Sequence, residues 1–337
     1  MATVHLLTQF VWPDAAPTSI YSEQLADELI RRGHRVRLVG TTGHYRSLAR
    51  PAPQVEVIRL PTPRLTRGVL PAVLFEYMLV QRSFSRYVRT EVGAGDAVIA
   101  TSAPPGTPWL IAAIRRRRAH GIYRMHDYYP ELVRAVRELP AAAVRFLRRR
   151  WDRALARWDA VLKVGDNLGY HGANAQVLPD WAPYEFTAEE RLAHPMENRT
   201  ALYAGNFGYA HDVASFLPVA EKLHAEGYRL IARGDGPGFD QLPTWIECGP
   251  PFPDEATLRA ALLRSELHFV AAHPRHQEAF FPSKIWNSLE AGRRVISTGF
   301  AGPQAAELER FLATDHRLNK SKMADAVEAV LAQKVGR

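Results

Sequence analysis

The sequence has a single cysteine, Cys248, among its 337 residues. One cysteine excludes an internal disulfide and a zinc site built from several cysteines. No apolar run reaches the ~18 residues that a membrane-spanning helix needs. The longest run, 69–80, is interrupted by Glu76. The first residues, MATVHLLTQF, lack the charged segment and the cleavage site of a signal peptide. These features predict a cytoplasmic protein.

Several short motifs of known chemistry are also missing. The sequence has no phosphate loop of the G-x-x-x-x-G-K-[ST] type, no G-x-G-x-x-G fingerprint, no H-E-x-x-H and no G-x-S-x-G elbow. It has no D-x-D triplet to hold a divalent metal on a nucleotide diphosphate. Among the 13 histidines, only His273 and His276 approach a ligand spacing. We therefore expect neither a metal site nor a tightly bound cofactor.

The charge is unevenly distributed along the chain. Lys and Arg number 43 and Asp and Glu 35, which gives a net charge of +8. Residues 1–180 hold 26 basic and 15 acidic residues, whereas the remainder is slightly acidic. A basic half favours an anionic partner such as nucleic acid, membrane headgroups or a phosphorylated substrate. The basic residues form no known nucleic-acid reader motif, so we do not expect nucleic-acid binding. Only six of them are Lys, and such an arginine bias can also reflect codon usage.

Short β-branched runs alternate with helical stretches through both halves of the chain. The pattern predicts strands at 4–8, 35–39, 55–60, 97–100, 122–125, 161–164, 176–178, 200–204, 229–232, 267–271 and 294–297. It predicts helices at 19–32, 70–89, 106–120, 211–226, 282–291 and 321–333, and an arginine-rich helical stretch before 161. This alternation is typical of an α/β protein with parallel sheets and helices on both faces.

Prolines at 179, 183 and 195 interrupt the alternation. We predict an N-terminal domain over 1–180, a linker over 181–199 and a second domain over 200–320. Residues 321–337 are expected to form a C-terminal helix that packs back toward the first domain. In open parallel sheets, ligands bind beyond the carboxyl ends of the strands.

Three segments of the second half combine glycine or a cation with a predicted strand or helix end. YAGNFG (203–208) and RGDGP (233–237) each follow a strand, where glycine lets a phosphate approach the backbone. The Arg233 guanidinium can meet a phosphate as a fork of donors. Lys284 follows Pro282 at a helix start and would add a cation there. Plain turns use the same residue types, so a structural interpretation stays open.

One histidine of the first half occupies a comparable position. His126 lies in RMHDYYPE (124–131), directly after a predicted strand. A histidine at a strand end can hydrogen-bond a substrate or transfer a proton. A lone histidine is more often structural, and both interpretations remain open.

Residues 63–89 predict a basic amphipathic helix. Apolar and neutral residues recur at helical spacing, namely Leu70, Val73, Leu74, Tyr77, Met78 and Gln81. Arginines flank them, namely Arg64, Arg67, Arg82, Arg86 and Arg89, and the ranges 115–118 and 145–150 add basic clusters. Such a helix can lie on anionic lipid, although its apolar face can equally pack on the sheet. We expect peripheral contact with the inner face of the cell membrane.

Taken in order, these segments resemble the retaining glycosyltransferases of family four, most closely the bacterial enzymes of polysaccharide and lipid-linked glycan synthesis. In the first half the resemblance rests on LLTQFVWPDAAPTSIYSEQLADELIRRGHRVRLV, MHDYYPEL, VLKVGDNL and VLPDWAP. In the second half it rests on LYAGNFGYAHD, RGDGPG and FPSKIWNSLEAGRRVIS. The similarity spans nearly the whole chain. It implies the GT-B fold, two Rossmann-like domains facing a central cleft.

The resemblance also implies roles for individual residues. The catalytic group would be His126, near the transferred sugar, with Arg233, Lys284 and Glu278. The donor would contact Gly205, Asn206, Gly208, Gly234, Gly236, Phe252, Pro282, Ser283 and Asn287. The nucleotide base would lie by 249–253. The acceptor side would include Trp12, Thr18, Ser19, Ser102 and Asp127.

Some positions depart from the family pattern. Asn287 occupies a position where the family usually has Glu, and Glu290 one where Ala is usual. Arg293 and Arg294 replace a Lys-Pro pair, and Asp180 replaces a frequent Asn. The first-domain loop also lacks the paired glycines of many relatives. These departures concern the ribose contact and the choice of donor.

The activity implied is transfer of a hexosyl or N-acetylhexosaminyl group from a nucleotide sugar, with a UDP-sugar favoured over a GDP-sugar. The acceptor would be a glycan or a polyprenyl-linked sugar. By resemblance, the donor's own phosphate oxygen takes the acceptor proton and no metal is needed. Two alternatives remain: a nucleotide-sugar 2-epimerase on the same fold, and a non-catalytic partner subunit that binds nucleotide sugar.

Overall fold

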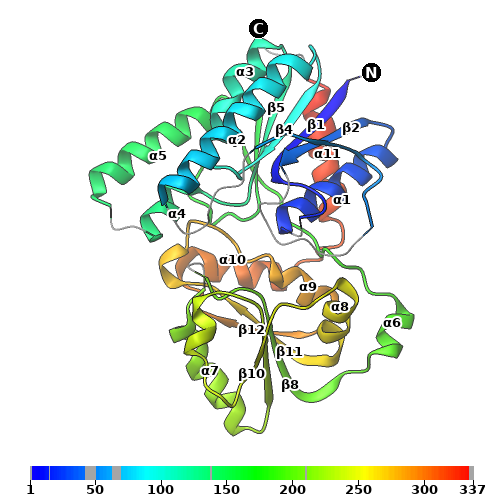
Figure 1. Cartoon of the computed structure of the whole chain (residues 1–337), viewed down its shortest axis with the longest axis vertical. Helices are drawn as coiled ribbons and strands as arrows, with labels where there is room; N and C mark the ends of the chain where they lie inside the picture. Colours follow the sequence, from blue (N-terminus) through cyan, green and yellow to red (C-terminus); the bar gives the residue numbers. More distant parts are fainter. Residues whose placement is uncertain are drawn as a thin grey trace. The chain divides into compact units, whose positions relative to one another are not determined.

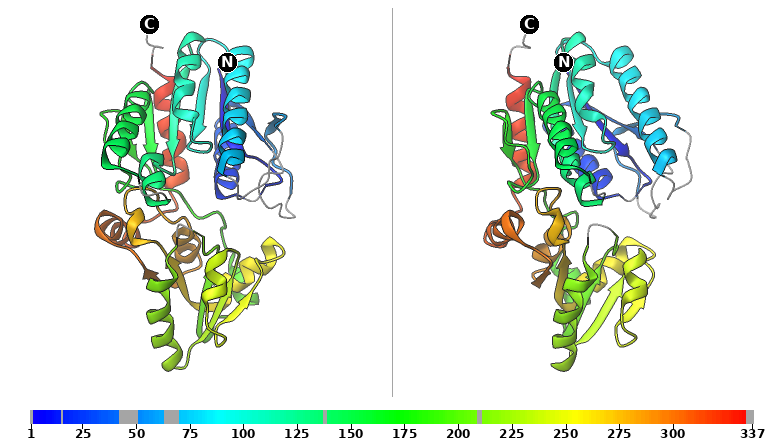
Figure 2. Two further views of the ribbon diagram at one scale, coloured as in Figure 1. Left: turned by 60° about the vertical axis from the view of Figure 1, so that its left-hand side comes forward. Right: turned by 90° about the vertical axis from the view of Figure 1, so that its left-hand side faces the viewer.

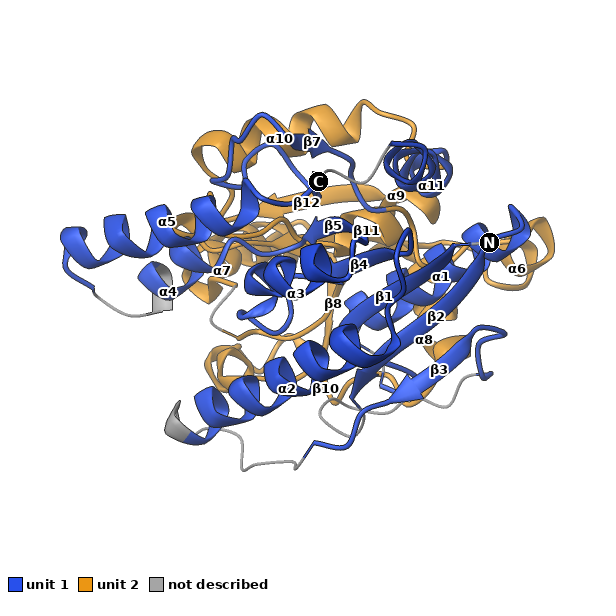
Figure 3. Ribbon diagram, turned by 90° about the horizontal axis from the view of Figure 1, so that it is seen from above, with its two compact units in different colours: residues 1–180, 318–337 blue, residues 181–317 orange. Residues whose placement is uncertain are grey.

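The computed structural model describes residues 2–14, 16–41, 51–62, 70–136, 139–208 and 211–333 (Figure 1). The chain forms two compact units. Unit 1 comprises residues 1–180 and 318–337, and unit 2 comprises residues 181–317, as coloured in Figure 3. Each unit has its own parallel sheet, so the α/β prediction with two Rossmann-like domains is confirmed.

Unit 1 contains a seven-stranded sheet in the order β3-β2-β1-β4-β5-β6-β7, in which every neighbouring pair is parallel. The strands are β1 (Thr3–Phe10), β2 (Arg35–Thr41), β3 (Glu56–Arg59), β4 (Ala97–Thr101), β5 (His120–Met125), β6 (Ala160–Lys163) and β7 (Ala175–Val177). The central strands β4 and β5 are buried along their whole length. Strands covered on both faces tend to be continuous apolar runs, as β4 is (AVIAT), whereas β5 also buries His120 and Arg124.

Six helices accompany this sheet in the described residues: α1 (Pro17–Arg31), α2 (Leu70–Glu91), α3 (Ile111–Arg116), α4 (Tyr129–Val136), α5 (Ala141–Leu155) and α11 (Asn319–Leu331). Figure 3 shows α2, α3 and α5 on one face of the sheet and α1 and α11 on the other. The helix predicted over 106–120 is shorter, because a 3-10 turn (Thr107–Leu110) precedes α3. None of the described helices combines the length and hydropathy needed to cross a bilayer.

Helix α2 packs on the sheet through Val80, Phe84 and Val88, which recur every fourth residue and are fully buried. Leu74 and Met78, on the apolar face expected to lie on lipid, are 52% and 56% exposed. These two side chains therefore do not pack on the sheet, as the alternative had it, and contact of this face with lipid stays a prediction. Arg64 and Arg67 lie outside the described residues.

Unit 2 contains a five-stranded parallel sheet in the order β10-β9-β8-β11-β12. Its strands are β8 (Glu197–Ala204), β9 (Arg229–Arg233), β10 (Glu247–Gly249), β11 (Ser265–Ala271) and β12 (Arg294–Thr298). Its helices are α6 (Ala188–Ala193), α7 (Val213–Ala225), α8 (Glu255–Arg264), α9 (Lys284–Glu290) and α10 (Gly302–Leu312), of which α7 and α8 stand out in Figure 2. The sequence patterns missed β10, α6, α8 and α10, as well as α4 in unit 1.

The core of unit 2 follows the two-residue alternation of β8. Tyr203 joins an apolar cluster with Phe207 and with Phe216 of α7. Leu202 belongs to a second cluster that includes Leu262 of α8. Successive side chains of a strand point to opposite faces, so one strand supplies both layers. Both clusters position the loop that follows β8.

Residues 181–199, predicted as a linker, belong to unit 2. Tyr184 and Phe186 are buried in the cluster that contains Leu202. Helix α6 starts with a capping box, in which the Thr187 hydroxyl and the Glu190 carboxylate each accept a backbone N–H. Proline content suggested a linker, but two aromatic side chains and a cap are enough to order the segment.

The C-terminal helix α11 belongs to unit 1 and lies beside α1 (Figure 2). The Arg32 guanidinium, just after α1, lies 2.6 Å from Asp325 Oδ1 and 2.9 Å from Glu328 Oε2. It also donates to the Ser321 hydroxyl at 2.7 Å. At the start of α11, Asn319 Nδ2 donates to the carbonyl of Asp180 at 2.8 Å. These bonds hold the C-terminal helix on the first sheet.

We predict that Arg32→Ala loosens α11. Loss of charge-assisted hydrogen bonds should lower the free energy of unfolding by about 1–3 kcal/mol and increase amide hydrogen exchange over 319–331. Arg31→Ala is the matched control. Its side chain is 61% exposed and pairs only with Glu28, so the change should stay within about 0.5 kcal/mol. Equal exchange of α11 in both variants would contradict the assignment.

Candidate functional site

The Lys284 side chain lies directly over Gly205. A Cβ atom on Gly205 would come within 1.8 Å of Lys284 Cε and 2.4 Å of Nζ. Gly205 follows β8, and its N–H donates to the carbonyl of Arg233, at the end of β9, at 2.8 Å. Only glycine leaves room for the lysine here. The structure therefore brings together three residues that the sequence predicted for the donor site.

The Lys284 ammonium has no carboxylate partner among the described residues. Its Nζ lies 3.1 Å from Nε2 of His211 and 5.5 Å from the centre of the Tyr203 ring. Burial lowers the pKa of Lys284 to about 8. A buried cation normally pairs with an acid, because removing an ion from water is costly. The Lys284 ammonium beside Gly205 is therefore a candidate anion site.

His211 is a site residue that the sequence analysis did not single out. The Lys284 ammonium donates to its Nε2, so the proton of the neutral ring is on Nδ1. Nδ1 is buried and has no hydrogen-bond partner in the described part of the chain. Burial, then Lys284 and His276, lowers the pKa of His211 well below its ordinary value. A neutral His211 adds a donor beside the ammonium. Its partner is 73 residues away in sequence, so no local pattern indicates it.

Arg233 supplies a second cation at the same end of the sheet. Its exposed guanidinium lies against Gly249 of β10, where a Cβ atom would come within 2.0 Å of a guanidinium nitrogen. Within the described residues the guanidinium makes no hydrogen bond or ion pair. Its five donors are available to an anion. Arg233 ends β9, and the neighbouring strand β8 leads into Gly205, over which Lys284 of α9 lies.

Backbone packing requires glycine at two of the positions predicted for the donor site. A Cβ on Gly234 would lie 1.8 Å from the carbonyl oxygen of Gly205. A Cβ on Gly236 would lie 2.6 Å from that of Phe207, and its φ is +111°. Here the loops after β8 and β9 pack backbone against backbone. A side chain at position 234 would push against Gly205, and one at position 236 would push against Phe207.

Helix α9 carries further predicted residues. Pro282 is buried, and Ser283 is the N-cap of α9 without a side-chain bond, so the helix begins at Lys284 rather than at Pro282. The Oδ1 atom of Asn287 is buried and has no hydrogen-bond partner among the described residues. An unsatisfied buried acceptor is costly unless a ligand donor meets it.

Glu290, also on α9, forms ion pairs with three side chains of unit 2. Its carboxylate lies 3.2 Å from His316, 3.3 Å from Arg317 and 3.5 Å from Arg191. The Arg191 guanidinium also donates to the Glu290 carbonyl at 2.6 Å. The buried Glu290 thus ties α6 and the 315–317 segment to α9.

The other predicted donor residues are less informative. Asn206 is exposed, and its carbonyl accepts from the Tyr203 hydroxyl at 3.0 Å. Gly208 has open space where a Cβ would stand. Phe252 packs against the cluster that contains Tyr184. Glu278 is partly buried in the loop before α9.

In unit 1, His126 lies at the end of β5 beside a buried ion pair. Arg124 and Asp180 are 2.5 Å apart, and both are about 95% buried. His126 Nε2 lies 3.6 Å from Asp180, which is longer than a hydrogen bond, and its ring stacks on Tyr21. Burial raises the pKa of Asp180, but Arg124 and His126 outweigh burial and leave the pKa below its usual range. Neither ring nitrogen of His126 has a hydrogen-bond partner among the described residues.

Ser102 and Asp127 organise the turn that holds His126. The Ser102 hydroxyl accepts from the backbone N–H groups of His126 and Asp127, at 3.3 and 3.1 Å. It lies 3.4 Å from the Asp127 carboxyl, to which it donates. Burial raises the pKa of Asp127, and His126 and Ser102 lower it less. These three predicted residues are therefore neighbours.

The predicted acceptor residues of the first loop lie near the start of α1. The Arg59 guanidinium stands 5.1 Å from the centre of the Trp12 ring. The Ser19 hydroxyl is buried and donates to Glu23 at 2.8 Å, so an internal bond uses it. Thr18 is partly exposed, and its carbonyl accepts from the Ser22 hydroxyl. Trp12 and Thr18 retain surface for a ligand.

Among the residues that the structure describes, no three His, Cys, Asp or Glu side chains gather as they would around a metal ion. The positive charge beside Gly205 is that of the Lys284 ammonium.

We predict that UDP binding depends on the charge of Lys284. The ammonium binds an anion only while protonated, so affinity should fall as pH rises through about 8. Lys284→Met keeps the length of the side chain and removes the charge. It should weaken UDP binding at pH 7 by at least about tenfold and abolish this pH dependence. Calorimetric titration between pH 7 and 9.5 measures both. Parallel pH profiles for the two proteins would rule out Lys284 as the titrating group.

A second prediction concerns His211. His211→Ala removes an acceptor that orients Lys284 and should weaken UDP binding about three- to tenfold. His211→Gln restores an acceptor and should recover most of the loss. His224→Ala is the control, because His224 stacks on Trp245 elsewhere in unit 2. Equal losses for the Ala and Gln variants would show that His211 acts only through packing.

Comparison with known proteins finds a similarity to a sequence family within the first unit. Residues 18–166 match the family described as Glycosyl transferase 4-like domain. This range lies within unit 1. No curated protein matches the sequence.

Solved structures match both units together. Sucrose-phosphate synthase from Thermosynechococcus elongatus is 15% identical, with a TM-score of 0.62 over 98% of this chain and 95% of that chain. WaaG, a glycosyltransferase involved in lipopolysaccharide biosynthesis, is 15% identical, with a TM-score of 0.57 over 98% and 90%. The catalytic domain of starch synthase IV from Arabidopsis thaliana, bound to ADP and acarbose, is 12% identical, with a TM-score of 0.62 over 100% of both chains. The chain therefore has the GT-B fold.

Proposed function

We propose that the protein is a retaining glycosyltransferase that transfers a sugar from a nucleoside-diphosphate donor to a lipid-linked or polysaccharide acceptor. The observation that carries the proposal is the unpaired Lys284 ammonium beside Gly205, with Arg233 at the neighbouring strand end. Unit 2 thus offers two cations and close backbone approach, which is what a diphosphate requires.

The proposed reaction needs charge stabilisation more than a nucleophile. The bond between the anomeric carbon and the donor's phosphate oxygen breaks, and a bond to the acceptor hydroxyl oxygen forms on the same face of the sugar. The acceptor proton passes to an oxygen of the leaving diphosphate. Negative charge develops on that diphosphate, where the Lys284 ammonium and the Arg233 guanidinium would stabilise it. These two cations can replace a metal ion in this role.

The acceptor side of the proposal rests on unit 1. Neither ring nitrogen of His126 makes a hydrogen bond within the described part of the chain, and the residue is held by Ser102 and by stacking on Tyr21. A fixed imidazole of this kind can hydrogen-bond a sugar hydroxyl. The match of residues 18–166 to a glycosyl transferase 4-like domain supports this assignment. The buried Oδ1 of Asn287, in unit 2, would accept from a ribose hydroxyl.

We further propose a UDP-sugar donor and a cytoplasmic enzyme that contacts the inner face of the membrane. Support for a nucleoside diphosphate comes from ADP in the starch synthase structure. Support for membrane contact comes from basic clusters of unit 1 at 115–118 and 145–150. On α5, the exposed Phe146 stands among exposed arginines, an arrangement that suits an anionic lipid surface.

The direct test is a panel of nucleotide sugars incubated with the purified protein and with polyprenyl-linked or glycan acceptors. Proton NMR of the product reports the anomeric configuration, and retention is expected. Product with inverted configuration would contradict the mechanism. Epimerised donor formed without an acceptor would assign the 2-epimerase reaction instead. Donor binding with neither transfer nor epimerisation across the panel would assign a non-catalytic role.

We predict that His126→Ala lowers turnover at least about tenfold while the melting temperature moves by less than about 3 °C. The reason is that His126 makes no side-chain hydrogen bond in the described residues. His171→Ala, at an exposed histidine of the same unit, should leave both quantities unchanged. Normal turnover with a large drop in melting temperature would make His126 structural.

A further inference from the structure

Helix α2 turns a row of arginines away from the sheet. Arg82, Arg86 and Arg89 are exposed and follow one another at spacings of four and three residues. Such spacings place side chains on one face of a helix. The opposite face, with Val80 and Phe84, is fully buried. The three guanidinium groups therefore share one surface of unit 1.

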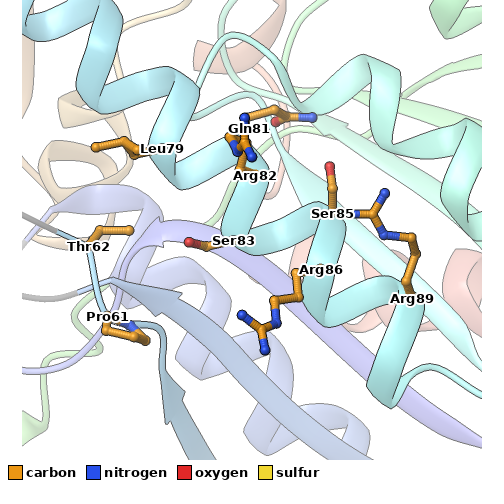
Figure 4. Close-up of a pocket in the computed structure, with 9 residues that line it drawn as sticks. All are labelled: Pro61, Thr62, Leu79, Gln81, Arg82, Ser83, Ser85, Arg86 and Arg89. Carbon is orange, nitrogen blue, oxygen red and sulfur yellow. The ribbon is translucent and has the colours of Figure 1, made fainter.

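A pocket of about 620 Å³ opens on this surface. Its lining comes from α2 and from the segment after β3, namely Pro61, Thr62, Leu79, Gln81, Arg82, Ser83, Ser85, Arg86 and Arg89. Figure 4 shows Arg86 reaching into the space between α2 and the segment that carries Pro61 and Thr62. Ser83 is turned toward the same segment.

The chemistry of the lining selects an anion with several acceptor oxygens. Three guanidinium groups, three hydroxyls and an amide line the pocket, and none of the described lining residues carries a carboxylate. Guanidinium forks match the oxygens of phosphate. The volume accommodates a phosphate or a diphosphate with part of the group that carries it.

The three arginines lack counter-charges. None of their side chains makes an ion pair or hydrogen bond with a described residue. The two acids of α2 are engaged elsewhere: Glu76 accepts from Gln9 at 3.4 Å, and Glu91 lies 4.0 Å from Arg37. Like charges three and four residues apart destabilise a helix. A bound anion would remove this repulsion.

An apolar surface precedes the arginines on the same helix. Phe75 and Met78 are 50% and 56% exposed. Phe75, Met78 and Arg82 follow one another at spacings of three and four residues, so they lie on the same face of the helix. Leu74, beside them, is 52% exposed. The outward face of α2 is thus apolar in its first half and cationic in its second. This order suits an amphiphile that has a hydrocarbon part and a phosphate head.

We propose that the pocket formed by Arg82, Arg86 and Arg89 binds a phosphate or diphosphate group carried by a lipid. The apolar half of α2 contacts the hydrocarbon part of that lipid. This site lies in unit 1, on residues separate from the Lys284 group, and does not depend on the transfer reaction.

Vesicle flotation of the full chain tests the proposal. Phosphatidylcholine vesicles contain either phosphatidic acid, with an uncapped phosphate, or phosphatidylserine, at matched surface charge. The wild type should bind the phosphatidic acid vesicles more tightly. R82Q/R86Q/R89Q should lose this preference and bind them at least about tenfold more weakly. Glutamine preserves helix propensity, so α2 should stay folded, which circular dichroism checks.

R145Q/R149Q/R153Q is the matched control, because it removes three exposed arginines from α5 of the same unit. This control variant loses the same number of positive charges as R82Q/R86Q/R89Q, so its charge-driven attraction to anionic vesicles should fall by the same amount. It should keep the preference for phosphatidic acid over phosphatidylserine. The proposal would be overturned if the wild type showed no preference for phosphatidic acid, or if both triple variants lost that preference equally. Either result would show that α2 attracts anionic vesicles only non-specifically.

Inorganic pyrophosphate separates a lipid source from a free one. Millimolar pyrophosphate should displace the wild type from phosphatidic acid vesicles more than equal ionic strength of chloride does. If the wild type binds pyrophosphate through these arginines and binds no vesicle, the ligand is a free phosphate compound and the lipid assignment is wrong. Lys284→Met tests independence: vesicle binding that falls with UDP binding would place both effects at one site and overturn the proposal.

Discussion

A positive charge without a counter-charge is the constraint on which unit 2 is built. The Lys284 ammonium is held over Gly205 by the start of α9 and by a neutral His211. Its desolvation lowers the pKa to about 8 instead of being offset by a carboxylate. A bound diphosphate beside the ends of β8 and β9 would offset this cost. Gly205 leaves room for the lysine, and Gly234 leaves room for the carbonyl of Gly205.

Unit 1 contains a buried cation, Arg124, that does have a carboxylate partner. Arg124 is buried at the end of β5, but Asp180 neutralises it at 2.5 Å, and the Leu178 carbonyl accepts from it. The pair stabilises the point where the chain leaves unit 1, and Asn319 binds the Asp180 carbonyl there. A buried arginine with its acid is a structural element, whereas a lysine without one is available to a ligand. Asp180 is thus the counter-charge that lets Arg124 be buried.

The alternation of strands and helices could be predicted because strands covered on both faces are continuous apolar runs. Lys284 and Arg233 could be predicted because each follows a local signal, a proline or glycine at a strand or helix boundary. His211 could not, because its role depends on a lysine 73 residues away. For α2, local spacing allowed the face with Leu74 and Met78 to lie either on lipid or on the sheet, and only the structure shows that Val80, Phe84 and Val88 pack on the sheet instead. Helix α8 was missed although Asp254 caps it through Thr257 at 2.7 Å.

The most direct measurement compares uridine, UMP and UDP as ligands of the wild-type protein by calorimetric titration at pH 7. If Lys284 and Arg233 hold a diphosphate, affinity should rise at least about tenfold with each phosphate added, because each charge-assisted hydrogen bond contributes about 1.5–3 kcal/mol. Equal affinity for the three ligands, or binding of none of them, would contradict the account of unit 2 as a diphosphate site.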